Sequence, residues 1–555
     1  MQRETIAGLL LDRLGDDQPG LRTREQAWTW DEVVRESAAR ASLTTSLRVD
    51  GPFHIGVLLD NVPEFLFWLG GAALSGATVV GINPTRQGSE LEQDVRYVDC
   101  QLIVTDTAGY RMLEGLDVGV ADDRILLVDS PEYHELLAPH TGVAPARSPR
   151  VDASTQMLLL FTSGTTGGSK AARCSQGRLS ALGSSNSTKY EITRDDICYC
   201  PMPLFHGNAL MALWAPALTV GACVALTPKF SASGFLPDVR LFGATFFTYV
   251  GKAISYILAT PEGQNDRGSA LTHGFGTEAS AEDQAEFSRR FGCRLVEGYG
   301  SSEGSGHVQL DPEAPAAALG RPAHEGVVVV DPETLEVRPP AVLDDQGRIQ
   351  NSEEAIGEIV NKKGAARFEG YYKNEAADAE RVRHGWFWTG DLGYVDKAGY
   401  LYFAGRSGDW IQVDGENISA LALEQILRRH PDILAAGAFG IPDPRTGDQV
   451  MVALEIPTGV GFEDLRLPEF LAAQEDLGTK STPRFVRVSA QLPTTGSNKL
   501  RKKEMQLQWW RSSDAVYFWQ GRGAPEYRLM TEDDKEALSA EFVANGRQRY
   551  LPTER

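Results

Sequence analysis

The sequence predicts an α/β protein with more than one domain, and three observations support this fold class. A chain of 555 residues is too long for a single hydrophobic core. Up to about residue 310, helical patterns alternate with short apolar runs, which is typical of mostly parallel sheets covered by helices. Two segments of this region also resemble each other, which predicts two similar α/β subdomains. The apolar runs that read as strands are Ile55–Leu59, Leu102–Thr105, Ile125–Val128 and Thr245–Tyr249.

The two similar segments are the uncharged stretches Phe65–Ile82 and Ala209–Leu226, in which Trp68 and Trp214 occupy equivalent places. Each stretch is long enough to raise the question of a transmembrane helix. Because each contains glycines and ends in a β-branched run, a buried helix, a tight glycine turn and a buried strand explain it better. We predict no integral membrane span, and a peripheral membrane contact stays open.

The two ends of the chain give further expectations. Residues 1–14 have acidic residues around a short apolar core, which reads as an amphipathic helix and not as a signal peptide. The tail beyond residue 509 is rich in aromatic residues, and we expect it to be irregular and to wrap its own domain.

A change of pattern in the last part of the large domain predicts a small β-rich subdomain, with short runs between Asp, Gly and Pro turns. A second change at residues 406–410 predicts a small, mobile α+β domain. The boundary therefore separates an N-terminal domain over 1–406 from a C-terminal domain over 407–555. The expected strands and helices are Val327–Val330, Gly357–Val360, Leu401–Phe403, helix Ala420–Arg429, Ala435–Phe439, Val450–Ile456, helix Leu467–Gln474 and Phe485–Val488.

Composition narrows the classes of function. The composition is 42% hydrophobic and 23% charged, as in an ordinary soluble protein. The net charge of −21 argues against general nucleic-acid binding and against polybasic docking on anionic membranes. The six cysteines form neither a disulfide framework nor a CxxC pair, so buried thiols in a reducing cytoplasm are expected. The oligomeric state stays open, a homodimer included.

The most informative segment is the run Leu-Leu-Leu-Phe-Thr-Ser-Gly-Thr-Thr-Gly-Gly-Ser-Lys at residues 158–170. An apolar strand is followed by small residues and one lysine, so backbone N–H groups, hydroxyls and an ammonium can gather around a polyphosphate. It is not a Walker loop, because Ser169 precedes Lys170 and Ala171 follows it. A flexible linker is the alternative, but linkers rarely follow a buried strand directly.

Three later segments add polar groups at turns. Residues 297–303, Glu-Gly-Tyr-Gly-Ser-Ser-Glu, combine an aromatic ring, hydroxyls and a carboxylate. Residues 386–391, Trp-Phe-Trp-Thr-Gly-Asp, place an acid in an expected tight turn. Residues 401–406 end in an arginine and are followed by a second glycine turn at 413–419. Each segment alone also has a purely structural explanation.

Taken in this order and spacing, the four segments resemble the adenylate-forming superfamily of acyl-CoA synthetases, luciferases and peptide-synthetase adenylation domains. The resemblance covers about residues 50–510. A closer likeness is to the fatty-acid-transport-protein and very-long-chain acyl-CoA synthetase branch, with its bacterial relatives that activate fatty or steroid side-chain acids. Residues 247–252, 406–416 and the tail segments 514–518 and 527–531 carry that closer likeness.

The resemblance implies a nucleotide site. Lys499, Glu303, His206 and Thr165 would be the catalytic residues, with Glu303 as the ligand of Mg²⁺. Tyr299 would stack on adenine, Ser302 would contact the α-phosphate, Asp391 would bind the ribose hydroxyls, and Arg406 would reach the ribose or phosphate. The residues that would bind ATP or AMP are Thr162, Ser163, Gly164, Thr165, Thr166, Gly167, Lys170, Gly274, Gly276, Thr277, Glu278, Tyr299, Gly300, Ser301, Ser302, Asp391, Arg406 and Lys499.

The resemblance also implies an acyl pocket and a thiol tunnel, formed by His206, Asn208, Ala209, Trp214, Tyr249, Val250, Gly415 and Glu416. Gly408 or Asp409 would be the hinge of the C-terminal domain. Two residues depart from the family pattern. Ser169 stands where proline usually precedes the phosphate-loop lysine, and Asn498 stands where glycine usually precedes Lys499. Asparagine tolerates left-handed backbone conformations, so the second turn can survive.

The resemblance therefore implies an AMP-forming acid–thiol ligase that uses ATP, Mg²⁺ and coenzyme A. It would adenylate a hydrophobic acid, a long-chain fatty acid first and a steroid side-chain acid second, release pyrophosphate and transfer the acyl group to coenzyme A. Its partners would be these small molecules. Transfer to the phosphopantetheine of a carrier protein is one alternative, and a lipid-uptake or scaffold protein is another.

Overall fold

The structure is a computed structural model of the 555-residue chain. The chain forms two compact units, one of Met1–Ala317 with Gly364–Gly385 and the other of Ala318–Lys363 with Trp386–Arg555. The residues that the structure describes are 4–162, 170–277, 279, 281–304, 308–311, 314–315, 318–344, 349–406, 410–413, 416–445, 448–474, 477, 481–494, 500–519 and 526–552.

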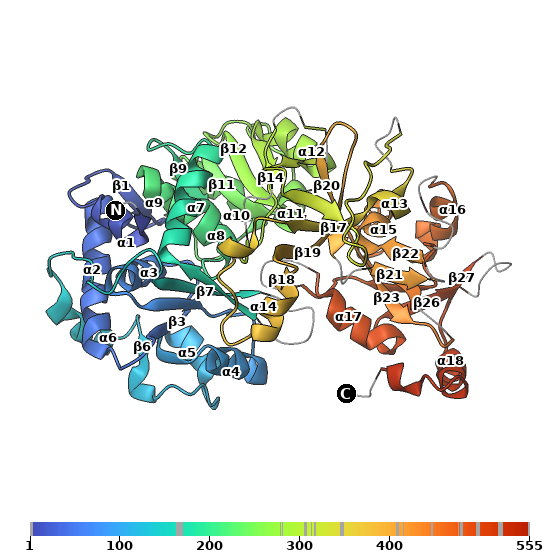
Figure 1. Ribbon diagram of the computed structural model, residues 1–555, viewed down its shortest axis with the longest axis horizontal. Helices are drawn as coiled ribbons and strands as arrows, with labels where there is room; N and C mark the ends of the chain where they lie inside the picture. Colours follow the sequence, from blue (N-terminus) through green and yellow to red (C-terminus); the bar gives the residue numbers. More distant parts are fainter. Residues whose placement is uncertain are drawn as a thin grey trace. The chain divides into compact units, whose positions relative to one another are not determined.

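The first sheet of unit 1 has the strand order β6-β5-β3-β4-β7-β8. Figure 1 labels its strands β3, β6 and β7. All neighbouring strands are parallel except β7 and β8, which are antiparallel. The central strand β3 is buried on both faces, as expected for a parallel strand covered by helices. The bounds are β3 His54–Leu58, β4 Thr78–Gly81, β5 Cys100–Thr105, β6 Ile125–Leu127, β7 Gln156–Thr162 and β8 Lys170–Ser175.

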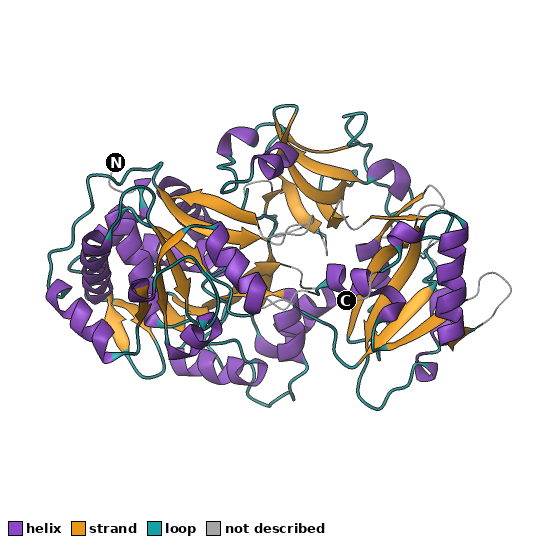
Figure 2. Cartoon of the chain, turned by 90° about the horizontal axis from the view of Figure 1, so that it is seen from below, coloured by secondary structure: helices purple, strands orange, loops and turns teal. Residues whose placement is uncertain are grey.

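The second sheet of unit 1 has the order β13-β12-β11-β9-β10-β1-β2. It is also parallel except at its last pair, β1 and β2. Figure 2 shows the strands of this unit with helices packed around them. The bounds are β1 Pro19–Arg22, β2 Ala27–Thr29, β9 Ile197–Cys200, β10 Cys223–Leu226, β11 Phe246–Val250, β12 His273–Thr277 and β13 Arg294–Glu297.

The two similar segments form equivalent parts of the two sheets. In the first, helix α3 (Pro63–Ser75) ends at Gly76, whose φ is 74°, and β4 follows. In the second, helix α9 (Ala215–Val220) ends at Gly221, whose φ is 83°, and β10 follows. Glycine adopts this left-handed conformation without strain. The predicted pair of similar α/β subdomains is confirmed, and no helix of the described residues is long and apolar enough to cross a membrane.

The other helices of unit 1 are built on caps and buried faces. Helix α2 begins with a capping box, in which Thr29 and Glu32 each bind the other's backbone N–H. The N-terminal helix differs from the prediction: α1 spans only Ile6–Leu11 and has five buried residues of six, so it is a core segment and not amphipathic. The helices are α2 Trp30–Leu47, α4 Gly88–Tyr97, α5 Thr107–Leu113, α6 Pro131–Leu137, α7 Gln176–Lys189, α8 Gly207–Ala209, α10 Ala232–Phe242, α11 Gly251–Leu258, α12 Ala281–Phe291 and α14 Glu375–Arg381.

Unit 2 contains the predicted β-rich part. Its antiparallel strands follow the order β15-β20-β19-β17-β16. The prediction of a tight turn at Asp391 is wrong, because residues 386–391 belong to the ten-residue strand β19. The bounds are β15 Ala318–Pro322, β16 Val327–Val330, β17 Gly357–Asn361, β19 Trp386–Val395 and β20 Leu401–Arg406.

The C-terminal α+β part has a five-stranded sheet of order β23-β24-β25-β26-β27, antiparallel except between β24 and β25. The aromatic tail is more regular than expected. It supplies β26, β27 and helix α18, and Phe542 of α18 packs with Phe485 and Trp510 in one core. The bounds are β21 Trp410–Val413, β22 Glu416–Ser419, α15 Ala420–Leu427, β23 Ala435–Pro442, β24 Asp448–Glu455, α16 Leu467–Ala472, β25 Phe485–Ser489, α17 Lys502–Gln508, β26 Ala515–Trp519, β27 Tyr527–Leu529 and α18 Glu532–Ala544.

The β-rich sheet and the C-terminal sheet both belong to unit 2. The predicted division into residues 1–406 and 407–555 stays a prediction, because residues 407–409 lie outside the described residues. The expected buried thiols are confirmed: all six cysteines are free and buried. Burial raises the pKa of the Cys174 and Cys200 thiols to about 12, which keeps them protonated and unreactive.

Candidate active site

The predicted phosphate loop begins and ends on two paired strands. The side chains of Met157, Leu158, Leu159 and Leu160 on β7 are buried, which confirms the predicted strand. At its end, Thr162 pairs with Lys170 of β8, and the Thr162 hydroxyl lies 3.5 Å from the Lys170 carbonyl oxygen. Both ends of the loop are therefore anchored at the same sheet edge. The predicted ligands between them lie outside the described residues: Ser163, Gly164, Thr165, Thr166 and Gly167.

The charged side chain of Lys170 is buried, with a residue exposure of 8%. Its Nζ lies 2.9 Å from Glu380 Oε2 of helix α14 and 5.6 Å from the centre of the Tyr371 ring. The carboxylate compensates the ammonium charge, and the ring face attracts it. Both partners come from residues 364–385, which we call the strap.

The strap runs along the edge strand β8. Tyr371 forms a bridge with Ala172, and the Tyr372 N–H donates to the Ala171 carbonyl oxygen at 2.8 Å. The Glu369 carboxylate accepts hydrogen bonds from the backbone and the hydroxyl of Ser175, at 2.7 and 2.6 Å. These bonds satisfy the open edge of the sheet and hold the strap beside Lys170.

Glu303, the predicted metal ligand, is 5% exposed. Its Oε1 accepts a hydrogen bond from the Tyr371 hydroxyl at 2.8 Å, and Arg381 Nη2 lies 4.0 Å from the same oxygen. Burial raises the pKa of Glu303, but the Arg381 charge and the Tyr371 hydroxyl lower it more, so the pKa lies below its ordinary value. Glu303 is therefore a buried carboxylate that is ionised at neutral pH.

The donor set at Glu303 fits Mg²⁺ if a nucleotide supplies the other ligands. Among the residues that the structure describes, no group of three or more His, Cys, Asp or Glu side chains could hold a metal ion. In nucleotide sites Mg²⁺ usually takes one or two carboxylates, and phosphate oxygens and water complete its octahedron. A single ionised carboxylate satisfies the protein's share of that arrangement.

Ser302 lies between Glu303 and the segment that carries His206. Its carbonyl oxygen accepts a hydrogen bond from Arg178 Nη2 of α7 at 2.7 Å. A Cβ atom on Gly207 would lie 3.1 Å from the Ser302 hydroxyl, so the two segments are close. In the same loop the Ser301 N–H donates to the Gly304 carbonyl oxygen at 2.9 Å, which closes a tight turn that contains Glu303.

The predicted adenine-binding strip depends on glycines that allow close packing. A Cβ atom on Gly274 or Gly276 of β12 would lie 2.3 Å from the ring of Phe247 or Tyr249, respectively. The Gly298 N–H donates to the Gly276 carbonyl oxygen at 2.8 Å and brings the following residues beside β12. Those residues include Tyr299 and Gly300. Thr277 ends β12, and Glu278 lies outside the described residues.

His206 precedes helix α8, and its ring centre lies 4.3 Å from that of Phe205. Asn61 holds this segment in place. It is 4% exposed, its amide donates to the Met202 carbonyl oxygen at 2.9 Å, and its side-chain oxygen accepts from the Leu204 N–H at 2.8 Å. The loop after β3 of the first sheet thereby fixes the His206 loop after β9 of the second sheet.

The residues expected to line the acyl pocket fall on two faces of β11. Ala209, Trp214 and Val250 belong to one apolar cluster on the side of α8. Tyr249 belongs to the cluster on the opposite face, and its hydroxyl donates to Glu297 at 2.7 Å. Asn208 connects the two, because its amide donates to the Tyr249 carbonyl oxygen at 3.3 Å. Tyr249 therefore packs in the core on the far face of β11, whereas Ala209, Trp214 and Val250 lie together on the side of α8.

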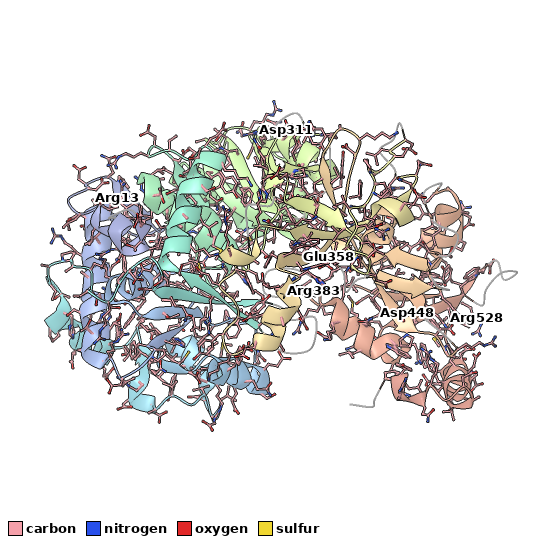
Figure 3. All side chains as sticks on the ribbon, in the orientation of Figure 1. Arg13, Asp311, Glu358, Arg383, Asp448 and Arg528 are labelled. Carbon is pink, nitrogen blue, oxygen red and sulfur yellow. The ribbon has the colours of Figure 1, made fainter. Side chains whose placement is uncertain are left out.

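Within unit 2, Asp391 of β19 is the register partner of Arg406 of β20. Gly390 has a φ of 72°, a left-handed conformation that glycine favours within this irregular strand. Its N–H donates to the buried Glu358 carboxylate of β17 at 3.0 Å, and the Asp391 N–H donates to the Thr389 hydroxyl at 3.1 Å. Glu358 is labelled in Figure 3. These bonds set the backbone that presents Asp391, although the predicted turn is absent.

Several predicted residues are not placed by the structure. Lys499, Gly408, Asp409 and Gly415 lie outside the described residues, and only the backbones of Arg406 and Glu416 are described. Helix α17 starts at Lys502, three residues after Lys499. Lys502 pairs with Glu424 at 2.6 Å.

Comparison with known proteins identifies the family. The family model described as AMP-binding enzyme matches residues 13–372. The family model described as AMP-binding enzyme C-terminal domain matches residues 422–499. The chain belongs to the AMP-binding enzyme family. The predicted membership of the adenylate-forming superfamily is confirmed.

Two relatives specify the kind of AMP-binding enzyme. Steroid-22-oyl-CoA synthetase of Rhodococcus jostii is 65% identical over 99% of both chains. Medium/long-chain-fatty-acid–CoA ligase FadD17 of Mycobacterium tuberculosis is 41% identical over 92% of this chain and 98% of its own. The predicted acid–CoA ligase is confirmed at this level.

A solved structure supports the fold. ATP-bound MatB of Rhodopseudomonas palustris superposes with a TM-score of 0.78 at 21% identity, and the match covers 91% of this chain and 99% of MatB. The predicted α/β class with a large N-terminal part and a small C-terminal part is confirmed.

Sequence reasoning missed the residues of this AMP-binding enzyme that surround the predicted site. Tyr371, Glu380 and Arg381 of the strap contact Lys170 and Glu303, and Asn61 and Arg178 hold the loops of His206 and Ser302. The alternating charges of Glu380-Arg381 were the one available signal. A charged pair on a short helix normally indicates only a solvated face.

Proposed function

We propose that this AMP-binding enzyme is an ATP-dependent acyl-CoA synthetase for a steroid side-chain acid. The observation that carries the proposal is the gap between the two relatives: 65% identity with a steroid-22-oyl-CoA synthetase against 41% with a fatty-acid–CoA ligase. This gap reverses the order of substrates that the sequence alone suggested. Long-chain fatty acids remain the second candidate.

Polar atoms beside the apolar cluster support a substrate that carries oxygen as well as hydrocarbon. Thr248 of β11 is fully buried, and neither its hydroxyl nor Asn208 Oδ1 has a hydrogen-bond partner among the described residues. Strand alternation puts Thr248 on the same face as Val250, in the cluster with Trp214. An unpaired buried polar group is costly. A ring hydroxyl or ketone of a steroid would satisfy such a group, and a fatty-acid tail would not.

In the first half-reaction the carboxylate of the acid attacks the α-phosphorus of ATP, and the bond to the bridging oxygen breaks. The products are acyl-AMP and pyrophosphate. Lys170 neutralises charge on the β- and γ-phosphates, and Ser302 contacts the α-phosphate. Glu303 would hold Mg²⁺, which would supply positive charge to the phosphate oxygens. Asp391 binds the ribose, and Lys499 adds a positive charge at the α-phosphate.

In the second half-reaction the thiol of coenzyme A attacks the acyl carbonyl carbon. A thioester bond forms, the mixed-anhydride bond breaks, and AMP leaves with its electron pair. His206 lies between the acyl site and the thiol entry. We propose that the C-terminal domain rotates about Gly408 or Asp409, so that Lys499 withdraws before the thiol arrives.

The test is a substrate panel with the full-length protein. ATP–pyrophosphate exchange and thioester formation are measured with a steroid C22 acid, a long-chain fatty acid and an aromatic acid, each with Mg²⁺ and coenzyme A. The proposal expects the highest kcat/KM for the steroid acid and the CoA thioester as the product. Exchange without a CoA thioester, or thioester formed only on a carrier protein, would favour the carrier-loading alternative.

A further inference from the structure

Lys170 and Glu303 each meet a side chain of opposite charge, and the two side chains are consecutive in the strap. Glu380 pairs with Lys170, whereas Arg381 lies 4.0 Å from Glu303 and also donates to the Tyr371 hydroxyl at 3.1 Å. The Tyr371 ring contacts the Lys170 ammonium and its hydroxyl binds Glu303. The strap thus gives each of the two predicted phosphate-site charges its own counter-ion.

The pair of Lys170 and Glu380 is asymmetric. The Lys170 side chain is 10% exposed, whereas the Glu380 side chain is 55% exposed. Breaking the pair therefore costs little for Glu380, which can turn into water, but leaves a buried ammonium that needs another anion. A phosphate oxygen can replace a carboxylate oxygen at an ammonium, because both are charged hydrogen-bond acceptors.

We propose that Glu380 is a built-in competitor of the ATP phosphates for Lys170. The inference rests on the proposed function, in which Lys170 binds the β- and γ-phosphates. Glu380 keeps the buried lysine compensated and in place until a polyphosphate displaces it. Arg381 compensates the charge of Glu303 in the same way. Removing the charge of Glu380 therefore strengthens polyphosphate binding.

The test is Glu380→Gln, with binding of ATP, pyrophosphate and AMP to the full-length protein measured by calorimetry in the presence of Mg²⁺. Neither acid nor coenzyme A is added. A partly exposed ion pair of this kind corresponds to an expected decrease of about twofold to fivefold in the Kd of ATP and pyrophosphate. The Kd of AMP stays unchanged, because AMP lacks the β- and γ-phosphates.

The matched control is Glu375→Gln, which removes one charge from an exposed residue of the same helix. It changes the net charge equally and is expected to leave all three Kd values within experimental error. Glu380→Ala repeats the test without an amide that could still accept a hydrogen bond from Lys170, and it is expected to tighten ATP at least as much. Thermal unfolding checks that the variants fold.

The outcomes separate this inference from the proposed function. Tighter ATP and pyrophosphate with unchanged AMP support the competition. Unchanged or weaker ATP binding in both Glu380 variants, with normal binding by the wild-type protein, overturns the competition and leaves the proposed function intact. Equal tightening in Glu375→Gln also overturns it, since net charge would then be the cause. If the wild-type protein binds neither ATP nor pyrophosphate, the proposed function fails and the inference fails with it.

Discussion

Replacing Glu303 by Gln separates the chemistry of the site from its packing. The change is nearly isosteric, and the amide oxygen of Gln can still accept the hydrogen bond that the Tyr371 hydroxyl donates at 2.8 Å. The variant loses the negative charge that faces Arg381 at 4.0 Å. It also loses the only protein carboxylate that we assign to Mg²⁺. The two losses differ greatly in size.

The loss of folding stability is small. A hydrogen bond to a charged group contributes about 1.5–3 kcal/mol and a neutral one about 0.5–1.5 kcal/mol, so the bond weakens by about 1 kcal/mol. A buried amide costs less to desolvate than the carboxylate, which offsets part of this. Loss of the charge that we assign to Mg²⁺ binding would remove electrostatic stabilisation of the transition state, and we expect a decrease of about 10²–10³ in the rate of adenylation.

The assay is ATP–pyrophosphate exchange over a Mg²⁺ titration, with thermal unfolding in parallel. We expect a midpoint within about 4 °C of the wild-type value and a loss of exchange that saturating Mg²⁺ does not restore. Glu369→Gln is the matched control, because Glu369 lies in the strap and accepts two hydrogen bonds from Ser175, away from the predicted metal site. It should unfold similarly and exchange normally. Near-normal exchange by Glu303→Gln at saturating Mg²⁺ would refute the metal assignment.

Three further predictions address the rest of the nucleotide site. Asp391→Ala should remove the two charge-assisted hydrogen bonds to the ribose that we propose for Asp391, and so raise the Kd of ATP by about tenfold or more. An unchanged Kd with a collapse of thermal stability would make Asp391 purely structural. Lys499→Ala should slow acyl-AMP formation by orders of magnitude and spare conversion of prepared acyl-AMP to thioester, whereas Gly408→Pro should do the opposite; equal slowing of both half-reactions by Lys499→Ala contradicts the two-conformation mechanism. The pKa of Glu303 lies below its ordinary value. The carboxylate is therefore charged at neutral and mildly acidic pH, and it loses its charge only as the pH falls through the lowered pKa. The Mg²⁺ concentration that half-saturates exchange should therefore be the same at pH 7 and at about pH 5.5, and a large increase in that concentration between the two would show that Glu303 protonates there.

Much of the fold follows from local patterns. Three elements begin where the sequence predicts them: the strands at Ile125 and Val327 and the helix at Ala420. A buried strand needs a continuous apolar run and a buried helix needs a periodic one, and both patterns can be read from the sequence alone. The two glycine turns at Gly76 and Gly221 were equally clear, since a left-handed residue after a buried helix favours glycine.

The errors arose where non-local pairing decides the conformation. The segment that ends at Asp391 contains a glycine and an acid, which normally favours a turn. Pairing with β17 and β20 on both sides keeps it in one strand, and Gly390 absorbs the irregularity. The aromatic tail has no strong periodicity, and its strands form because the edge of β25 is available for pairing.

The site was predictable only as far as its motifs extend. Lys170 and Glu303 lie in recognisable segments, but the contacts of the strap join residues more than sixty positions apart in sequence. No local pattern distinguishes Glu380 or Tyr371 from ordinary surface and core residues. Asn61 was missed for the same reason, since its partners lie 141 and 143 residues away.

A competition between two acids tests the central claim most directly. The full-length protein receives equal concentrations of a steroid C22 acid and palmitate, with Mg²⁺, coenzyme A and limiting ATP, and mass spectrometry quantifies the CoA thioesters. The ratio of the two products at early times equals the ratio of kcat/KM values. The proposed function predicts the steroid thioester as the main product, with one AMP formed per thioester. A palmitoyl thioester in equal or larger amount would contradict it.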